Sequence, residues 1–449
     1  MHDLLKGSIC VDVLISNVTA VTMNEKLDVL FGAYLGVTGG KITYLAKQPP
    51  QQQPSTIIDG TGMVAMPGLV NCHTHLVTTV MRSFVDDAGR AAALEQQLQR
   101  EAKLDDRSAK AAALLGIAEC LRFGITSVSD LYYYPDAVAS AAEQSGINAN
   151  VALSSYRFID ESEDFDFETD DQCRESCRVA DKWHGHDDGR IRVDAGLYAE
   201  YISNYKLWEG LSAWAAEANL GLQLHLAETE EEAAGCLDRT GLGPAELLNA
   251  HGLFRVPTTA VGCVALHEEE RKLLGKKKVS AVATPIAYAK AGLPATPILE
   301  NVKAGMNVAL GTGGAVECGN LDMFEVMRAA ALSARCAGGD ADSLPAAAAL
   351  MMATTCGARA QGRADTTGML KEGMDADLIL VDFSAPHLIP CHDVMNALVF
   401  SAKGGDVAMT MVRGKVLYQN GKFPTIDMPA VVEELMHYAI PRLMQQDKE

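Results

Sequence analysis

The chain has 449 residues, of which 48% are hydrophobic, and a formal net charge of −20 with a pI near 5.0. This length allows one large domain and a smaller one. The acidic balance argues against nucleic acid or an anionic membrane surface as a partner. The eleven cysteines, an odd number, favour reduced thiols and a cytoplasmic protein. No signal peptide precedes Asp12, and no apolar run is long enough to cross a bilayer.

Short strands are expected at both ends of the chain. They lie at Val11 to Thr22, Val29 to Val37, Ile42 to Leu45, Leu378 to Val381, Val407 to Val412 and Lys415 to Tyr418. We therefore predict a small β-sandwich domain formed from residues 1–63 and 366–449. A terminal amphipathic helix is expected over Val431 to Ile440, stopped or kinked at Pro441.

Between these ends, apolar strand-like runs alternate with helical periodicity, a pattern typical of repeated βα units. The expected strands are Val64 to Asn71, Thr126 to Asp130, Ala149 to Leu153, Ile191 to Leu197, Gly221 to Leu226, Thr259 to Val264, Val279 to Thr284 and Asn307 to Gly311. Eight such strands close a TIM barrel. The predicted fold class is thus α/β, a (β/α)8 barrel over residues 64–365.

Histidines stand where two of these strands end. His73 and His75 are two residues apart, so on a strand their side chains point to the same face. His225 lies at the end of the fifth expected strand, and Glu228 follows three residues later. In a TIM barrel the chemistry lies at the carboxyl ends of the strands. Three histidines can hold a tetrahedral zinc ion with one open position, and a nearby carboxylate can move protons.

Five segments carry a resemblance to a known family. They are Pro67–His75 (PGLVNCHTH), His225–Thr229 (HLAET), Leu310–Gly314 (LGTGG), Asn320–Glu325 (NLDMFE) and Gly373–Leu378 (GMDADL). The chain resembles the amidohydrolase superfamily over nearly its whole length. The similarity is to the branch that contains S-adenosylhomocysteine and methylthioadenosine deaminases, guanine and cytosine deaminases and triazine chlorohydrolases.

The resemblance implies roles for the residues already singled out. His73, His75 and His225 would bind one divalent metal ion, zinc or iron, and Glu228 would transfer protons. The family also has a strand-six histidine, a strand-eight aspartate, a substrate-side histidine and a histidine after strand seven. This sequence has Gly262, Gly313, Tyr198 and Ala283 at those four places.

Three further residues are candidates for contact with the bound molecule. Asp87 follows the first expected barrel strand, in a loop that covers the substrate in relatives, and Tyr198 takes a substrate-side position. Glu317 lies four residues past Gly313. Its carboxylate could face substrate or solvent, or turn inward to replace the missing aspartate.

Two functions therefore remain open. In the first, the chain is a metal-dependent hydrolase of carbon–nitrogen bonds, a deaminase of purine nucleosides or other heterocyclic amines with an incomplete metal and base set. In the second, catalysis has lapsed and the chain is a ligand-binding, regulatory or partner subunit. Either function predicts a small heterocyclic ligand, and the resemblance implies a homodimer or a higher homo-oligomer.

Overall fold

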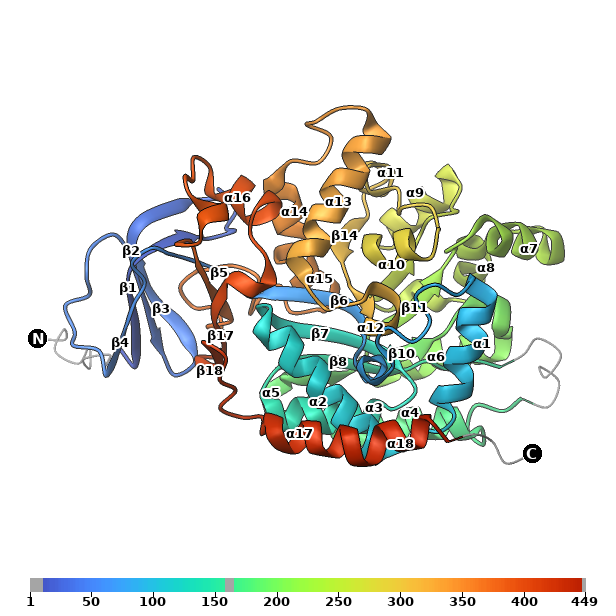
Figure 1. Ribbon diagram of the computed structural model, residues 1–449. Coiled ribbons are helices and arrows are strands. Elements are labelled where there is room, and N and C mark those ends of the chain that lie inside the picture. The colour runs from blue at the N-terminus through green and yellow to red at the C-terminus, as the bar shows by residue number, and fades with distance from the viewer. Residues whose placement is uncertain (1–10, 158–164, 446–449) are drawn as a thin grey trace, which may run out of the picture.

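The computed structural model describes residues 11–157 and 165–445. Figure 1 shows a larger body of strands surrounded by helices, with a smaller, mainly β region beside it. The two chain ends both contribute to the smaller region, as the blue and red strands on the left of the figure show. No helix in the described ranges is long and apolar enough to span a membrane.

Two five-stranded parallel sheets form the larger body. The first has the order β15-β6-β7-β8-β9 and the second β10-β11-β12-β13-β14. The bounds of the first are β6 Leu69–His75, β7 Ile125–Tyr132, β8 Asn148–Leu153, β9 Ile191–Val193 and β15 Gly313–Gly314. Those of the second are β10 Ala195–Leu197, β11 Leu222–Leu226, β12 Thr258–Gly262, β13 Ser280–Ala283 and β14 Asn307–Leu310.

The two sheets meet where a strand passes from one to the other. Only Asp194 separates β9 from β10, and only Gly311 and Thr312 separate β14 from β15. A bridge between Ser155 and Leu197 joins the sheets again. The arrangement is therefore an α/β, TIM-barrel-like fold, with strands at all eight expected places.

Two expected strands need correction. The segment Ile191 to Leu197 was expected as one strand but forms β9 and β10, which belong to different sheets. The segment Val64 to Asn71 was expected as a single barrel strand, but β5 (Met63–Pro67) pairs with β1 and β16 of the smaller region. The barrel strand β6 begins only at Leu69 and runs to His75. A β-carbon at Gly68, between them, would lie 2.1 Å from Thr126 Oγ1. The chain thus changes sheets at a glycine that packs directly against β7.

Strands from both ends of the chain pair in one eight-stranded mixed sheet. Its order is β18-β17-β16-β5-β1-β2-β3, with β4 paired to β1. The bounds are β1 Val13–Val21, β2 Val29–Thr38, β3 Lys41–Ala46, β4 Thr56–Asp59, β16 Leu378–Asp382, β17 Val407–Val412 and β18 Lys415–Gln419. The chain therefore leaves this sheet, forms the larger body and returns.

Helices cover the larger body. The longer ones are α1 Arg90–Glu101, α2 Asp106–Arg122, α3 Pro135–Ser145, α4 Asp171–Trp183, α6 Tyr205–Glu217, α7 Glu230–Thr240, α9 Glu268–Lys276 and α13 Met323–Gly338. The shorter ones are α5 His186–Gly189, α8 Pro244–Ala250, α10 Pro285–Lys290, α11 Ile298–Lys303, α12 Ala315–Cys318, α14 Ala346–Met352, α15 Thr355–Ala360 and α16 Val394–Phe400.

The C-terminal helix was expected to stop or kink at Pro441, and it continues past this residue. It consists of α17 (Met428–Glu434), a π-helical turn over Leu435–Ala439 and α18 (Ile440–Leu443). Proline cannot donate the backbone hydrogen bond of a regular helix, and a wider turn accommodates that loss. The helix packs along α2, as the red element below the barrel in Figure 1 shows.

Side-chain alternation brings the site residues to one face. In β11, Leu222, Leu224 and Leu226 belong to the main hydrophobic core, whereas Gln223 and His225 point to the other face. Both faces of this strand are buried, as expected for a parallel strand covered by helices. His225 therefore points into the interior at the carboxyl end of its strand.

Candidate metal centre and its cavity

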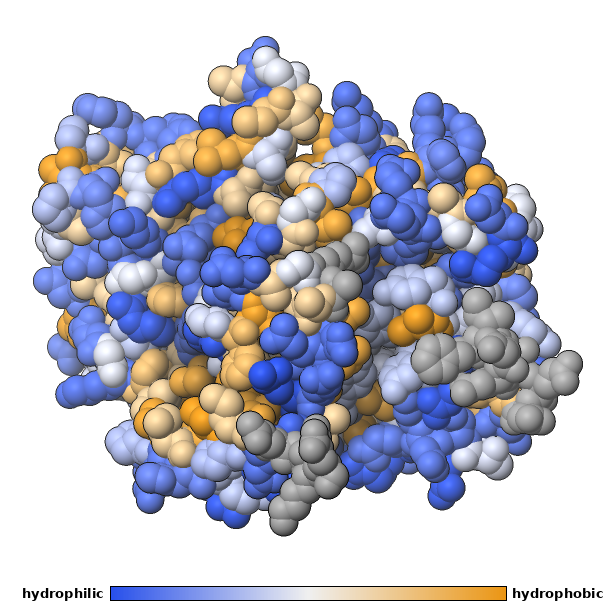
Figure 2. Space-filling model, turned by 45° about the vertical axis from the view of Figure 1, so that its right-hand side comes forward, coloured by the Kyte–Doolittle hydropathy of each residue, from blue (hydrophilic) through white to orange (hydrophobic). Residues whose placement is uncertain are grey.

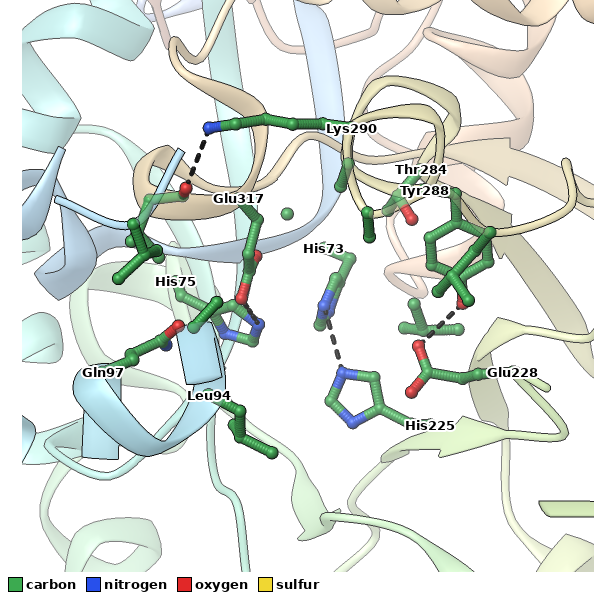
Figure 3. A pocket seen from close by; sticks show the side chains of 18 of the residues that line it. His73, His75, Leu94, Gln97, His225, Glu228, Thr284, Tyr288, Lys290 and Glu317 are labelled. Carbon is green, nitrogen blue, oxygen red and sulfur yellow. Dashed lines mark hydrogen bonds and ion pairs between the residues drawn. The ribbon is translucent and has the colours of Figure 1, made fainter. Parts of the chain in front are cut away.

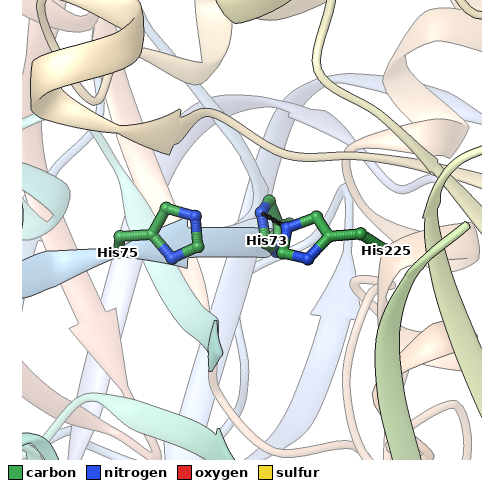
Figure 4. Close-up of side chains that lie close together, drawn as sticks. All are labelled: His73, His75 and His225. Carbon is green, nitrogen blue, oxygen red and sulfur yellow. Dashed lines mark hydrogen bonds between the residues drawn. The ribbon is translucent and has the colours of Figure 1, made fainter. Parts of the chain in front are cut away.

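Three histidines from two strands form a compact cluster. His73 and His75 at the end of β6, and His225 at the end of β11, each offer a ring nitrogen within 4.8 Å of the others. Figure 4 shows the three rings meeting from opposite sides. The structure thus brings together the three residues predicted as metal ligands.

The hydrogen bonds of His225 fix its tautomer. Its Nδ1 lies 2.9 Å from the carbonyl oxygen of Tyr198. Because a carbonyl can only accept, Nδ1 carries the proton and Nε2 keeps its lone pair. That Nε2 lies 3.3 Å from Nε2 of His73. An outer carbonyl that orients a ring in this way is the usual support of a metal-binding histidine.

Burial keeps His73 and His75 neutral. Loss of hydration lowers the pKa of His73 well below its usual value, and the neighbouring His75 and His225 lower it further. Burial lowers the pKa of His75 as well. Neutral imidazole is the form that binds metal ions. The described part of the chain offers no hydrogen-bond partner to the buried Nδ1 atoms of these two histidines, so each of these atoms has room for an ordered water as its partner.

The spacing of the ring nitrogens agrees with a shared cation. Two nitrogen ligands at about 2.05 Å from a tetrahedral ion lie about 3.3 Å apart, which matches the separation of the two Nε2 atoms. The residues present therefore fit one divalent metal ion.

The cluster opens into a cavity of about 480 Å³. Figure 3 shows Glu228 and Glu317 on either side of the histidines within it. Tyrosines and apolar side chains form much of the remaining wall, among them Tyr132, Tyr133, Leu94 and Leu98. A cavity of this size and mixed lining suits a small molecule.

Glu228 is held in place by a tyrosine. The hydroxyl of Tyr288 on α10 donates to Glu228 Oε1 at 2.7 Å. Burial, together with the adjacent Glu228 carboxylate, raises the pKa of this phenol well above its usual value, so Tyr288 remains the donor. The backbone N–H of Glu228 donates in turn to the Glu232 carboxylate at 2.7 Å. The second Glu228 oxygen has no such fixed partner among the hydrogen bonds of the described residues.

The Tyr288 hydroxyl fills space beside Gly262. A β-carbon at Gly262 would lie 2.7 Å from that hydroxyl and 3.0 Å from Glu228 Cγ, and the backbone φ of +95° also favours glycine. The resemblance led us to expect a histidine at residue 262. In this protein the space for such a side chain is filled by Tyr288, which comes from the next βα unit.

Glu317 takes up the corresponding space beside Gly313. A β-carbon at Gly313 would lie 2.9 Å from Glu317 Oε2. The other carboxylate oxygen lies 3.8 Å from His75 Nε2. The Glu317 carboxylate lines the cavity, and 35% of the side chain is exposed.

The structure separates the remaining candidates. Tyr198 lines the cavity, with its ring 5.4 Å from that of His225 between centroids. Asp87 is exposed and is not among the lining residues, whereas Asp86 lines the cavity and forms an ion pair with Lys290 at 2.6 Å. Ala283 ends β13 and is buried, and the next residue, Thr284, faces the cavity.

Sequence reasoning missed Tyr288, Lys290 and Glu101. The first two lie on α10, just after β13, where a βα loop of a barrel is expected to carry site residues. Their position directly after a barrel strand could have indicated Tyr288 and Lys290 as site residues. Glu101 ends α1 and accepts a hydrogen bond from the Tyr132 hydroxyl, and nothing in the sequence near it indicates a site.

Asp130 supports the end of the strand that carries His73 and His75, and its ionisation makes the stability of the protein depend on pH. Its carboxylate accepts the backbone N–H of Leu76 at 2.7 Å, directly after His75. Burial raises the pKa of Asp130 to about 7, above its unfolded value. The native state therefore binds more protons than the unfolded state between pH about 4 and 7, and the free energy of unfolding falls as pH rises through that range.

We expect Asp130→Asn to flatten this dependence. Urea unfolding of both proteins at pH 5 and pH 8, with chelator present so that metal binding adds no proton linkage, should show a smaller loss of stability in the variant. An equal loss in both proteins would show that Asp130 is not the group responsible.

Comparisons with known proteins identify the family of this chain. A sequence profile of the amidohydrolase family matches residues 64–417. The 5-methylthioadenosine/S-adenosylhomocysteine deaminase of Thermoanaerobacter pseudethanolicus is 32% identical, covering 94% of this chain and 97% of that protein. The 5'-deoxyadenosine deaminase of Methanosarcina acetivorans is 36% identical, covering 94% and 96%. The zinc-bound crystal structure of an adenosine deaminase from Xanthomonas campestris superimposes with a TM-score of 0.88 at 28% identity, covering 97% and 98%.

The chain therefore belongs to the amidohydrolase family. These relatives are deaminases, and the chain is similar to them over nearly their whole length, so it is a deaminase-like hydrolase.

Proposed function

We propose that this protein removes an amino group from a small nitrogen heterocycle, such as an aminopurine nucleoside, by hydrolysis. The observation that carries the proposal is the placement of three histidines and Glu228 around one cavity. Zinc or iron is the proposed ion, with His73, His75 and His225 as its ligands. The names of the relatives support an adenosine-type substrate.

Each residue of the site has its own role in the proposed reaction. A divalent cation held by the histidines would act as a Lewis acid and lower the pKa of a water molecule. Glu228 accepts a proton as the water oxygen attacks the ring carbon that carries the amine. It then donates this proton to the departing nitrogen, so that ammonia leaves. The remaining hydroxyl proton moves to the adjacent ring nitrogen, which leaves a carbonyl. Tyr198 keeps His225 in the tautomer that the site requires.

Tyr288 acts through Glu228 in this scheme, as a positioning residue. Tyr288→Phe removes the hydroxyl but keeps the ring, and we expect a roughly tenfold fall in kcat, which corresponds to about 1.4 kcal/mol for one hydrogen bond to a charged group. KM should change little, because Tyr288 touches Glu228 rather than the substrate in this scheme. An unchanged kcat would remove Tyr288 from the mechanism.

The charges of the cavity narrow the substrate class. Among its described lining residues, Lys290 is the only lysine or arginine, and the Asp86 carboxylate neutralises its charge. Glu101, Glu228 and Glu317 add acidic groups. We therefore propose a neutral or cationic heterocycle rather than a phosphorylated one.

Two measurements test the function. The first is metal content per chain, in protein purified without chelator or a histidine tag. The second is ammonia release from adenosine-, guanine- and triazine-type amines. Metal near one equivalent with ammonia release from one class supports the proposal. Bound heterocycle without ammonia release from any class would instead support a ligand-binding protein whose catalysis has lapsed.

The proposal also covers the architecture around the site. We propose that the two parallel sheets act as one closed (β/α)8 barrel within residues 64–365. Residues 1–63 and 366–449, joined by the rest of β5, would form the small β domain, proposed as a sandwich, around the eight-stranded sheet. The ten cysteines described as free thiols support a cytoplasmic protein. Sedimentation velocity would test the proposed homo-oligomer.

A further inference from the structure

The carboxylate of Glu317 faces the histidine cluster from the side opposite Glu228 (Figure 3). Its Oε1 lies 3.8 Å from His75 Nε2. His75 is one of the three residues proposed to hold the cation. A carboxylate oxygen at this distance from its ring nitrogen is placed to share that cation with it.

The backbone holds Glu317 in this orientation. Its Oε2 accepts the N–H of Gly314 at 2.5 Å, closing the first turn of α12 on itself. A carboxylate has about four lone-pair sites, so Oε1 stays available while Oε2 is bound. Gly314 pairs with His75 across β15 and β6, which ties the carboxylate to the strand that carries two of the histidines.

Gly313 makes the room that this arrangement needs. Any β-carbon there would lie 2.9 Å from Glu317 Oε2 and 3.3 Å from Ala287 Cβ, and the backbone φ is +71°. Glycine at residue 313 and glutamate at residue 317 are thus a matched pair.

The distances permit a shared ion. Two ligand atoms about 2.1 Å from one metal ion can be separated by at most about 4.2 Å, and Oε1 and His75 Nε2 lie within that limit. Among the described residues, only the three histidines have ligand atoms that all lie within 4.8 Å of one another. Oε1 must therefore move toward the other two histidines when the ion binds, while Oε2 keeps its hydrogen bond to Gly314.

We propose that Glu317 is a fourth protein ligand of the divalent ion, supplying its one negative charge. The inference rests on the proposed metal site. It assigns to α12, outside the strands, a ligand that works together with the strand histidines.

The test measures metal affinity without reference to turnover. Zinc dissociation constants are obtained by competition with a chromophoric chelator, and cobalt-substituted protein is followed by its visible spectrum. Glu317→Gln keeps the length of the side chain and its acceptor for Gly314, so it should remain folded. We expect zinc affinity to fall at least about tenfold and the cobalt spectrum to change, whereas Glu300→Gln, at an exposed site on α11, should change neither.

A second variant moves the carboxylate onto the strand. Gly313→Asp with Glu317→Ala should recover affinity relative to Glu317→Ala alone, because aspartate tolerates positive φ and the closest clash, with Glu317, is removed, which leaves Ala287 Cβ at 3.3 Å. Unchanged zinc affinity and cobalt spectrum in Glu317→Gln would overturn the inference, as would a higher KM as its only effect, which indicates a substrate contact. If the unaltered protein binds no zinc, the proposed metal site fails with it.

Discussion

Replacement of His225 by alanine is expected to abolish both metal binding and turnover. The ring nitrogen it removes lies 3.3 Å from that of His73, and the remaining pair comes from a single strand. Two imidazoles two residues apart leave half of a tetrahedral coordination shell unfilled. Metal content should fall from near one equivalent to near zero, and ammonia release should become undetectable.

His437→Ala is the matched control, because His437 is exposed on the C-terminal helix, far along the chain from the cluster. Circular dichroism of both variants would show that the fold is retained. Turnover that survives the loss of His225 would contradict the three-histidine mechanism, even if the metal content fell.

Glu228→Gln should separate chemistry from metal binding. Glutamine keeps the acceptor for the Tyr288 hydroxyl but cannot take up or release a proton at pH 7. Loss of a general acid–base group typically lowers the rate by about 10²–10⁴-fold, and we expect kcat to fall within that range. Metal content and KM should change little.

Glu230→Gln is the matched control, because Glu230 lies two residues after Glu228 and is exposed at the start of α7. A Glu228→Gln variant with normal kcat would transfer the proton role to another group. Loss of metal in that variant would show instead that Glu228 acts as a ligand.

The histidine cluster could be predicted from sequence because local rules determine it. His73 and His75 share a face through strand alternation, and His225 ends a strand whose leucines are spaced by two. The positions of the eight strands follow from the same repetition of apolar runs. These features depend on near neighbours, so a single sequence contains them.

The side chains that complete the site depend on contacts between distant segments. Tyr288 reaches Glu228 across 60 residues, and Lys290 reaches Asp86 across 204. No periodicity indicates such pairs. The split of the first expected barrel strand at Gly68 also depends on a distant segment. The strand that pairs with β5 is β16, more than 300 residues later.

The close approach of Tyr288 to Gly262 makes substitutions at the two positions conditional on each other. With only 2.7 Å between the tyrosine hydroxyl and the place of a β-carbon, any larger residue at 262 must displace the group that orients Glu228. Tyr288 has to be replaced by a smaller residue first, and Glu228 then loses its orienting hydrogen bond before a side chain at residue 262 can take part in catalysis. A histidine at residue 262 is thus reached only through an intermediate with lower activity. This chain and a relative with a histidine there would be separated by a fitness valley as well as by two mutations.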